Sequence, residues 1–308
     1  MSSTHATESA LWALDGAPVW LNSEPLTAEG LRGHVVLVDF WTYSCVNWLR
    51  TLPYLRAWAE RYRDRGLVVV GPHAPEFGFE HDLANVRHAA DELGVGYPVV
   101  IDNEFAIWRS FANQYWPAVY LVDGDGRVRF HHFGEGAYEE TERAIQDVLG
   151  VDEDTVRVDA GGLAEAADWA TLGSPETYVG HARAERRNDA RADRLALNEW
   201  ALAGHWSVDA ESAALEAPGG SIAYRFEARD VNLVLAPPPS GAPVRFAVRL
   251  DDRAPGGAHG VDVDESGDGV VDEPRMYQLV RRRGQAGECR FEISFLDAGV
   301  RAYVFTFG

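Results

Sequence analysis

The sequence predicts two parts of different class, a small α/β domain followed by an all-β antiparallel sandwich of jelly-roll type. The chain has 308 residues, whereas one ordinary domain has roughly 100–200 residues. Apolar strand-like and helix-like runs alternate over residues 1–150, which is typical of an α/β domain. Short alternating strands separated by glycine and proline turns fill residues 198–308, which indicates a sandwich.

The elements of the α/β part follow in order. A short strand is expected at 18–21, and the continuous apolar run 35–40 suits a central parallel strand. Apolar residues then recur at helical spacing from Cys45 to Tyr62, and Gly66 is a stop signal. Further strands are predicted at 67–70, 97–101, 118–122 and 128–132, and further helices at 83–93, 105–111 and 138–149.

Residues 151–197 differ from both parts. They are acidic at first and then highly charged, and we expect a linker with some helix. The predicted strands of the sandwich are 222–226, 233–235, 244–250, 289–295 and 303–307. Cys289 alternates with Phe291 and Ile293, so it is expected to be a small core residue rather than a resolving thiol.

Composition and charge restrict the class of partner. The formal net charge of -20 opposes binding to nucleic acid and to anionic membranes. Two cysteines leave no disulfide framework, which agrees with a reducing compartment. Residues 1–8 lack signal-peptide features, and no stretch approaches the roughly 18 apolar residues of a membrane span. We therefore expect a cytoplasmic protein with no membrane insertion.

Cys45 lies where an apolar strand runs into a helix. Unpaired backbone N–H groups and the positive end of a helix dipole stabilise a thiolate there, which predicts a nucleophile that forms a mixed disulfide or a sulfenic acid. The alternative is a vestigial thiol in a fold kept for binding. Trp48 shares a helical face with Leu52 and Leu55, so it is either a core residue or a ring that shields the thiol or stacks on a ligand.

Three further features carry a family resemblance. Asp39 lies six residues before Cys45, Pro53 lies five after Trp48, and Trp116-Pro117 precedes an apolar strand. With these features the chain resembles the thioredoxin-like proteins of the TlpA and DipZ type, and residues 150–308 resemble the carbohydrate-module-like C-terminal sandwich of DipZ-like proteins. Family members carry a second cysteine where this chain has Trp48, so their two-cysteine cycle cannot be transferred.

The resemblance implies roles for named residues. Asp39 corresponds to a buried acid that manages protons, and here it is either a relic or still tunes Cys45. Thr42 lies three residues before Cys45, as in a peroxiredoxin T-x-x-C signature, whose hydroxyl positions peroxide. Pro117 is expected in a cis peptide that faces Cys45 and an extended substrate. The predicted catalytic residues are Cys45, Asp39 and Thr42, and the predicted substrate contacts are Trp41, Trp48, Trp116 and Pro117.

Two other segments have two interpretations each. His73, Glu76 and Phe77 follow a central strand at its carboxyl end, and they either line a pocket or form an ordinary polar loop. Residues 262–273 have the spacing of a calcium loop, the alternative being a solvated acidic turn. Its predicted ligands are Asp262, Asp264, Ser266, Asp268 and Glu273. No other cofactor is expected.

Two functions follow from these patterns. The first is a monothiol thioredoxin-like oxidoreductase or thiol peroxidase, in which Cys45 attacks a disulfide or peroxide and an external reducing thiol completes turnover. The second is a redox-inactive binding protein whose groove and sandwich recognise a peptide, glycan or partner protein. In that case Trp200 or Trp206 would stack on sugar rings.

Overall fold

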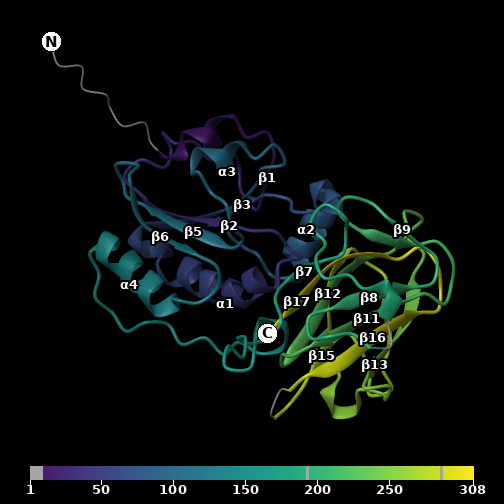
Figure 1. Cartoon of the computed structure of the whole chain (residues 1–308). Helices are drawn as coiled ribbons and strands as arrows, with labels where there is room; N and C mark the ends of the chain where they lie inside the picture. Colours follow the sequence, from purple (N-terminus) through teal and green to yellow (C-terminus); the bar gives the residue numbers. More distant parts are fainter. Residues whose placement is uncertain (1–9, 192–193, 285–286) are drawn as a thin grey trace. The chain divides into compact units, whose positions relative to one another are not determined.

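The computed structural model describes residues 10–191, 194–284 and 287–308. The N-terminal residues on which the signal-peptide expectation depends lie outside this range. The chain divides into two compact units, the first ending at Ala164 and the second beginning at Glu165 (Figure 1). Among the described helices, none combines the length and apolar character that a membrane crossing requires.

The first unit is built on a six-stranded sheet in the order β1-β4-β3-β2-β5-β6. Strands β2, β3 and β4 are parallel, and β1, β5 and β6 are antiparallel to their neighbours. The strands are β1 (Trp20–Leu21), β2 (Val35–Phe40), β3 (Leu67–His73), β4 (Val99–Ile101), β5 (Ala118–Val122) and β6 (Val128–Phe133). All six residues of β2 are buried, as its unbroken apolar run predicts.

Helices cover both faces of this sheet. In Figure 1, α3 and the N-terminal turn lie above it, and α1 and α4 lie below it. The helical elements are η1 (Ala10–Gly16), α1 (Val46–Arg61), η2 (Arg63–Arg65), η3 (Gly78–His81), α2 (Leu83–Glu92), α3 (Ala106–Ser110), α4 (Tyr138–Leu149) and η4 (Gly162–Ala164).

Strand alternation decides which face each β2 side chain meets. Val36, Val38 and Phe40 join a core with Ile107 of α3 and with Phe111, which directly follows that helix. Because successive side chains point to opposite faces of a sheet, Asp39 points to the other face, where α1 lies. The pattern therefore brings an acidic side chain under the helix that begins after Cys45.

The second unit contains two antiparallel sheets around one core. Their strand orders are β15-β12-β17-β10-β9, with β7 added beside β17, and β14-β13-β16-β11-β8. The strands are β7 (Thr177–Tyr178), β8 (Trp200–Ala203), β9 (Trp206–Val208), β10 (Ala213–Leu215), β11 (Ser221–Phe226), β12 (Asp230–Ala236), β13 (Val244–Leu250), β14 (Asp268–Val271), β15 (Arg275–Arg281), β16 (Cys289–Phe295) and β17 (Arg301–Phe307). The short turns η5 (Asp189–Arg191) and η6 (Gly256–Ala258) complete the unit.

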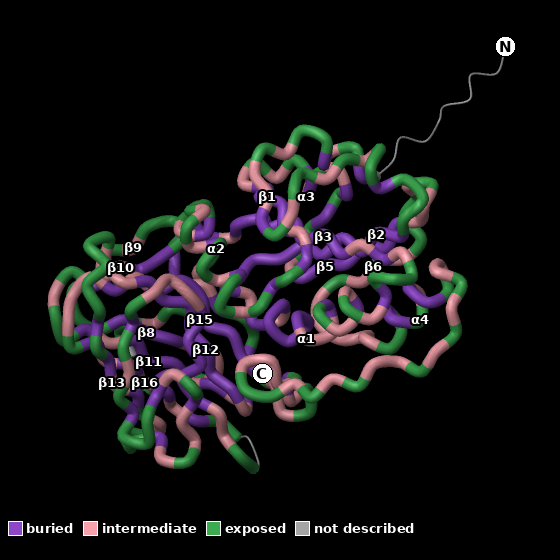
Figure 2. Tube along the Cα trace, turned by 180° about the vertical axis from the view of Figure 1, so that it is seen from behind, coloured by how far each residue is buried: buried purple, intermediate pink, exposed green. Residues whose placement is uncertain are grey.

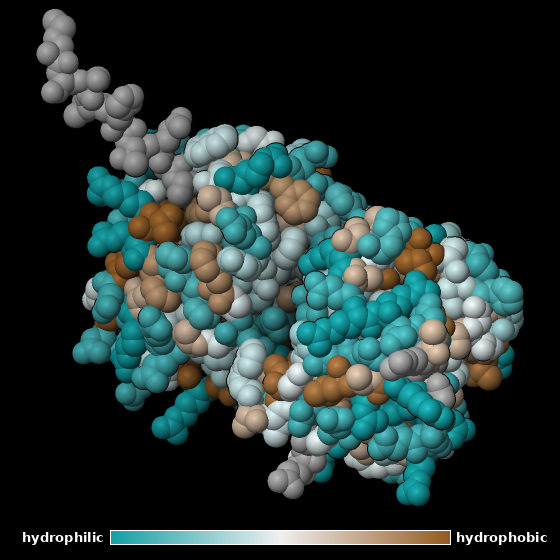
Figure 3. All heavy atoms as spheres, viewed as in Figure 1, coloured by the Kyte–Doolittle hydropathy of each residue, from teal (hydrophilic) through white to brown (hydrophobic). Residues whose placement is uncertain are grey.

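Burial agrees with the predicted two-part fold class. Aromatic side chains from both sheets of the second unit, including Trp200, Tyr224 and Phe305, belong to one buried cluster. Figure 2 shows that the strands of both units are mainly buried and that the connecting loops are mainly exposed. The face drawn in Figure 3 is largely hydrophilic, in keeping with the net charge of -20.

The predicted linker needs correction. Residues 151–197 contain no α-helix in their described part, only the 3-10 turns η4 and η5. Strand β7 pairs with β17 at Tyr178 and Val304, and Thr177 and Tyr224 share a buried hydrogen bond of 2.8 Å. The second unit therefore begins well before residue 198. A strand of two residues is too short to produce a readable alternation.

Candidate active site

Cys45 is the N-cap residue of α1, with extended backbone angles φ -78° and ψ 112°. Its amide donates to the Thr42 carbonyl at 3.2 Å, and its own carbonyl accepts from the Leu49 amide at 3.0 Å. Cys45 is half-buried, although Ser44 and Val46 beside it are buried. The first N–H groups of a helix have no partner within the helix, so this thiol lies at an electropositive end.

Trp48 lies one turn into α1 and is completely buried. Its indole N–H donates to Asp39 Oδ2 at 3.0 Å. Its ring stacks on Trp41, with centroids 4.3 Å apart and planes 26° from parallel. The interpretation of Trp48 as a core residue is therefore correct, and it adds a hydrogen bond to a buried acid.

The predicted substrate contacts of Trp41 and Trp48 need correction. Both indoles have 0 % exposure, so neither offers a ring face to a ligand. Trp41 donates its indole N–H to the Gly71 carbonyl at 3.2 Å. A Cβ on Gly71 would lie 2.9 Å from the Trp41 indole nitrogen, so the close approach requires glycine. The physical reason is that the two stacked rings fill the space between α1 and the sheet.

Asp39 is fully buried and accepts from two donors through one oxygen. Besides Trp48, the Tyr97 hydroxyl donates to Asp39 Oδ2 at 3.1 Å. The other oxygen, Oδ1, has no hydrogen-bond partner among the described residues. Burial raises the pKa of Asp39 to about 7, although the Trp48 and Tyr97 hydrogen bonds act in the opposite direction. Asp39 therefore changes charge near neutral pH, beneath the helix that Cys45 caps.

Sequence reasoning missed Glu80 as a site residue. Glu80 is completely buried in η3, and the Ser44 hydroxyl donates to its Oε1 at 2.5 Å. Burial raises its pKa to about 7, although the hydrogen bond from Ser44 acts in the opposite direction. Thr42 is itself completely buried. The expected pocket residues Glu76 and Phe77 lie just before Glu80 in the sequence. No residue spacing in this segment indicates that Glu80 is a buried acid.

His73 ends β3 and is completely buried between aromatic rings. Its ring lies edge-on to Trp41 at 4.8 Å and stacks on Tyr43 at 5.8 Å. In the part of the chain that the structure describes, neither ring nitrogen has a hydrogen-bond partner. Burial lowers the pKa of His73 to about 3, so its imidazole is neutral at physiological pH. His73 is therefore enclosed by its neighbours and does not form part of an exposed pocket wall.

The predicted cis peptide between Trp116 and Pro117 is confirmed. Trp116 is half-buried and donates its indole N–H to the Ala74 carbonyl at 3.0 Å. The Ala74 amide in turn donates to the Trp41 carbonyl at 3.0 Å, so Trp116 is connected to the segment that leads to Cys45. The Pro117 carbonyl accepts from the Gly134 amide at 2.8 Å and is already occupied.

The predicted calcium loop stays a prediction, and its acidic side chains make other contacts in the structure. The described residues contain no group of three or more His, Cys, Asp or Glu side chains that could hold a metal ion. Asp262 pairs with Arg275 at 2.9 Å and accepts from the Gln278 amide at 2.7 Å, while Asp264 accepts from the Ser266 and Asp268 amides. Asp268 begins strand β14, so the segment follows a β-ladder and its oxygens do not converge as in a calcium loop.

Two further expectations concern the second unit. Cys289 is buried, as predicted, and burial beside Asp251 raises the pKa of its thiol to about 11. Such a thiol is a poor resolving nucleophile. The proposed stacking of Trp200 on a sugar is wrong, because this indole is completely buried. Trp206 is half-buried and packs edge-on against Phe295 at 5.9 Å.

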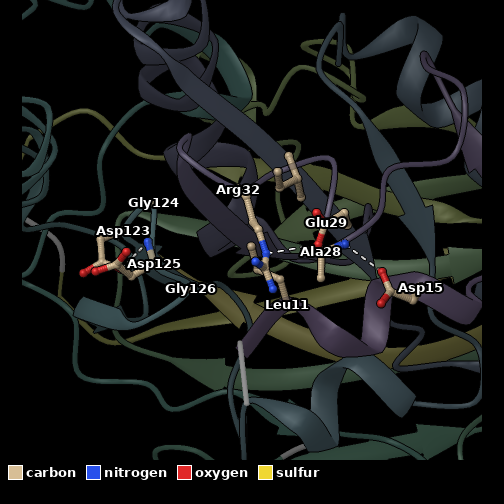
Figure 4. Close-up of a pocket in the computed structure, with 10 residues that line it drawn as sticks. Leu11, Asp15, Ala28, Glu29, Arg32, Asp123, Gly124, Asp125 and Gly126 are labelled. Carbon is tan, nitrogen blue, oxygen red and sulfur yellow. Dashed lines mark hydrogen bonds and ion pairs between the residues drawn. The ribbon is translucent and has the colours of Figure 1, made fainter. Parts of the chain in front are cut away.

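A separate pocket of about 360 Å³ lies elsewhere in the first unit (Figure 4). None of its lining residues belongs to the Cys45 site. Its charges are already engaged, since Arg32 pairs with Glu29 at 3.1 Å and Asp15 accepts from the Ala28 amide at 2.6 Å.

Comparison with known proteins supports both units. Residues 174–308 match the family described as thioredoxin like C-terminal domain. Protein DipZ of Mycobacterium tuberculosis is 36% identical over 238 residues, covering 72% of this chain and 34% of that protein. This chain thus spans about a third of the length of that relative.

A shorter relative matches less than half of this chain. Thiol-disulfide oxidoreductase YkuV of Bacillus subtilis is 31% identical over 137 residues, covering 44% of this chain and 91% of that protein. A solution structure of a thioredoxin-like protein in the oxidised form is 30% identical, covers 44% of this chain and 90% of its own, and has a TM-score of 0.40.

Proposed function

Because the chain belongs to the thioredoxin-like proteins of the DipZ type, we propose that it is a thiol–disulfide oxidoreductase working through Cys45 alone. One observation carries the proposal: Cys45 is the N-cap residue of α1 and is half-buried, so its thiol lies at the N-terminal end of the helix. That position stabilises a thiolate, and thiolates are the species that attack disulfides. Cys45 is partly exposed, and the Trp48 ring is buried in the core. These two observations favour an accessible thiol over an inaccessible one.

The proposed reaction has two exchange steps. The Cys45 thiolate attacks one sulfur of a substrate disulfide, forming a mixed disulfide and releasing the other sulfur as a thiolate. An external thiolate then attacks the substrate sulfur of this mixed disulfide. A new disulfide forms between substrate and external thiol, and the Cys45 thiolate is released. Electrons balance because each step breaks one S–S bond and forms one.

An external thiol is required because no second thiol lies in the first unit. Cys45 and Cys289 are the two cysteines of the chain, and the raised pKa of Cys289 disfavours its thiolate. Turnover therefore depends on a low-molecular-weight or protein thiol kept reduced by its surroundings. The cytoplasmic location expected from the sequence is part of this proposal.

Residues around Cys45 have supporting roles in the proposal. Asp39 tunes proton affinity beneath α1, and Thr42 holds the turn through its carbonyl. Trp116 and the Pro117 segment contact the substrate, since Trp116 is half-buried and connected to Trp41 through Ala74. If a peroxide is the oxidant instead, the same thiolate attacks it, releases an alkoxide or hydroxide and becomes a sulfenic acid. One external thiol then forms a mixed disulfide with loss of water, and a second external thiolate attacks this disulfide and releases Cys45.

The test is the rate of Cys45 alkylation as a function of pH, measured by mass spectrometry on the whole chain. We expect the Cys45 pKa to lie below the value of about 8.5 of a free thiol. Cys289 serves as an internal reference in the same molecule, and its raised pKa predicts slow labelling. Cys45→Ser should abolish both alkylation at this site and the mixed disulfide with oxidised glutathione.

The opposite result would support a different function. If Cys45 alkylates no faster than a free thiol and forms no mixed disulfide, catalysis is excluded. The chain would then be a redox-inactive binding protein that recognises a peptide, glycan or partner protein, and its ligand binding would survive Cys45→Ser.

A further inference from the structure

We propose that Glu80 is a positioning residue for Cys45: its carboxylate holds Ser44, and with it the turn that bears the thiol, while its charge opposes the thiolate. The inference rests on the proposed thiol chemistry of Cys45. Glu80 touches neither substrate nor sulfur in this proposal. It acts through Ser44, the residue that directly precedes Cys45.

Hydrogen bonds reach both oxygens of this carboxylate. Ser44 Oγ donates to Oε1 at 2.5 Å. The amides of Glu76 and Phe77 donate to Oε2 at 2.6 Å and 2.9 Å. One buried side chain thus ties the loop after β3 to a turn that lies 36 residues earlier in the sequence.

A carboxylate fits this set of donors better than any other side chain. The glutamine amide has one accepting oxygen, and its NH₂ group would face either Ser44 or the two amides. An apolar replacement would leave all three donors without this acceptor, which is unfavourable where they are shielded from water. The three donors therefore select an ionised Glu80, although it is completely buried.

The charges near Glu80 allow it to titrate near neutral pH. Burial raises the pKa of Glu80 most, Glu76 raises it further by like-charge repulsion, and the Ser44 and Phe77 hydrogen bonds lower it, giving about 7. His73 supplies no compensating cation, since burial keeps its imidazole neutral. When Glu80 ionises, the added negative charge disfavours a thiolate on the adjoining turn.

The experiment is the pH profile of Cys45 alkylation in the whole chain, with Glu80→Gln compared with wild type. In the wild type, the plot of alkylation rate against pH should show an inflection near pH 7 in addition to the inflection of the thiol, which lies at higher pH. Glu80→Gln should remove the contribution of Glu80 to this inflection, leave that of Asp39, and lower the apparent pKa of Cys45. Superimposable profiles would overturn the proposal.

Asp39→Asn is the matched control, because Asp39 is a second buried acid with a pKa of about 7 but binds Trp48 and not the turn. The Glu80 inflection should persist in Asp39→Asn. If Glu80→Gln does not fold, the Asp39→Asn variant still tests the proposal. A profile of that variant with the inflection of the Cys45 thiol alone, and none near pH 7, would refute the coupling of Glu80 to Cys45. If Cys45 in Asp39→Asn alkylates slowly but its profile shows the inflections of both Glu80 and the thiol, the proposed redox function is refuted. The coupling of Glu80 to Cys45 then stands.

Discussion

The Trp48 indole N–H donates to the Asp39 carboxylate at 3.0 Å, between two completely buried side chains. In thioredoxin-like relatives of the kind that this chain resembles, position 48 carries the second thiol. Here an N–H donor that cannot lose its proton replaces it. Asp39 is therefore held in a hydrogen bond and has no thiol at position 48 from which to accept a proton. In the proposed function, the redox chemistry is then carried out by Cys45 alone.

Trp48→Phe should show how much that hydrogen bond contributes. Phenylalanine keeps an aromatic ring against Trp41 but removes the donor to Asp39. Loss of a donor to a buried carboxyl costs about 1–3 kcal/mol, and we expect the free energy of unfolding in urea to fall by that amount at neutral pH. Trp41→Phe is the control, because it removes a hydrogen bond to the uncharged Gly71 carbonyl. Equal losses in the two variants would contradict a special role for Asp39.

Trp48→Cys should restore a dithiol at the start of α1. Cysteine at position 48 recreates the C-x-x-C spacing with Cys45, so the variant should form an internal disulfide and reduce insulin without an external resolving thiol. Removing a buried tryptophan should also cost about 3–5 kcal/mol of stability. Trp48→Ser is the matched control, since it creates a similar cavity without a thiol. If Trp48→Cys and Trp48→Ser are equally inactive, the site has lost more than its second cysteine.

Asp39→Asn should flatten the dependence of stability on pH. The pKa of Asp39 is raised from 3.8 to about 7 in the folded chain, so the folded state binds the extra proton between these values. The free energy of unfolding therefore falls as pH rises through this window, by on the order of 4 kcal/mol from this group. Urea unfolding at about pH 4.5 and about pH 7.5 measures the difference. A variant with an unchanged difference would show that Asp39 is ionised at both pH values.

Two other buried groups act in the same pH range. Glu80 also has a raised pKa and contributes a loss of stability with rising pH, so some dependence should remain in Asp39→Asn. His73 has the opposite sign, because its pKa is lowered from 6.5 to about 3 and its contribution is lost as pH falls. The comparison of Asp39→Asn with wild type cancels both contributions.

The sequence predicts what local chain patterns determine. The buried run of β2, the helix beginning after Cys45 and the cis peptide before Pro117 all follow from signals within a few residues. The contact of Trp48 with Asp39 required knowing that β2 and α1 pack face to face. Glu80 was missed because its partner Ser44 lies 36 residues away.

Other predictions depended on contacts that a local pattern does not reveal. The acidic segment 262–273 has the spacing of a calcium loop, and in the structure the pairing of β14 with β13 sets part of its backbone. Trp41 and Trp48 look like exposed recognition residues in a motif near a thiol, but stacking on each other buries both. In both cases the residue types suit the predicted role, but in the tertiary structure these side chains make contacts with other parts of the chain.

Arg50 and Glu135 form a nearly buried ion pair that connects α1 to the loop before α4. Their closest atoms are 2.7 Å apart, and their side chains are 2% and 5% exposed. Burial raises the pKa of Glu135 in spite of the Arg50 charge, which indicates that desolvation offsets much of the attraction. Arg50→Met should therefore destabilise the chain by about 3–5 kcal/mol, because it leaves a buried carboxylate unpaired.

The double variant Arg50→Met, Glu135→Leu tests this account of the pair. Removing both charges also removes the desolvation cost, so the double variant should recover most of the stability lost in Arg50→Met. Urea unfolding of the wild type, the two single variants and the double variant gives the coupling energy between the two positions. Additive losses would mean that each side chain contributes through its own packing and not through the pair. Arg50 lies in α1, whose N-cap residue is Cys45. We therefore expect the rate of Cys45 alkylation to be lowest in the least stable of these variants.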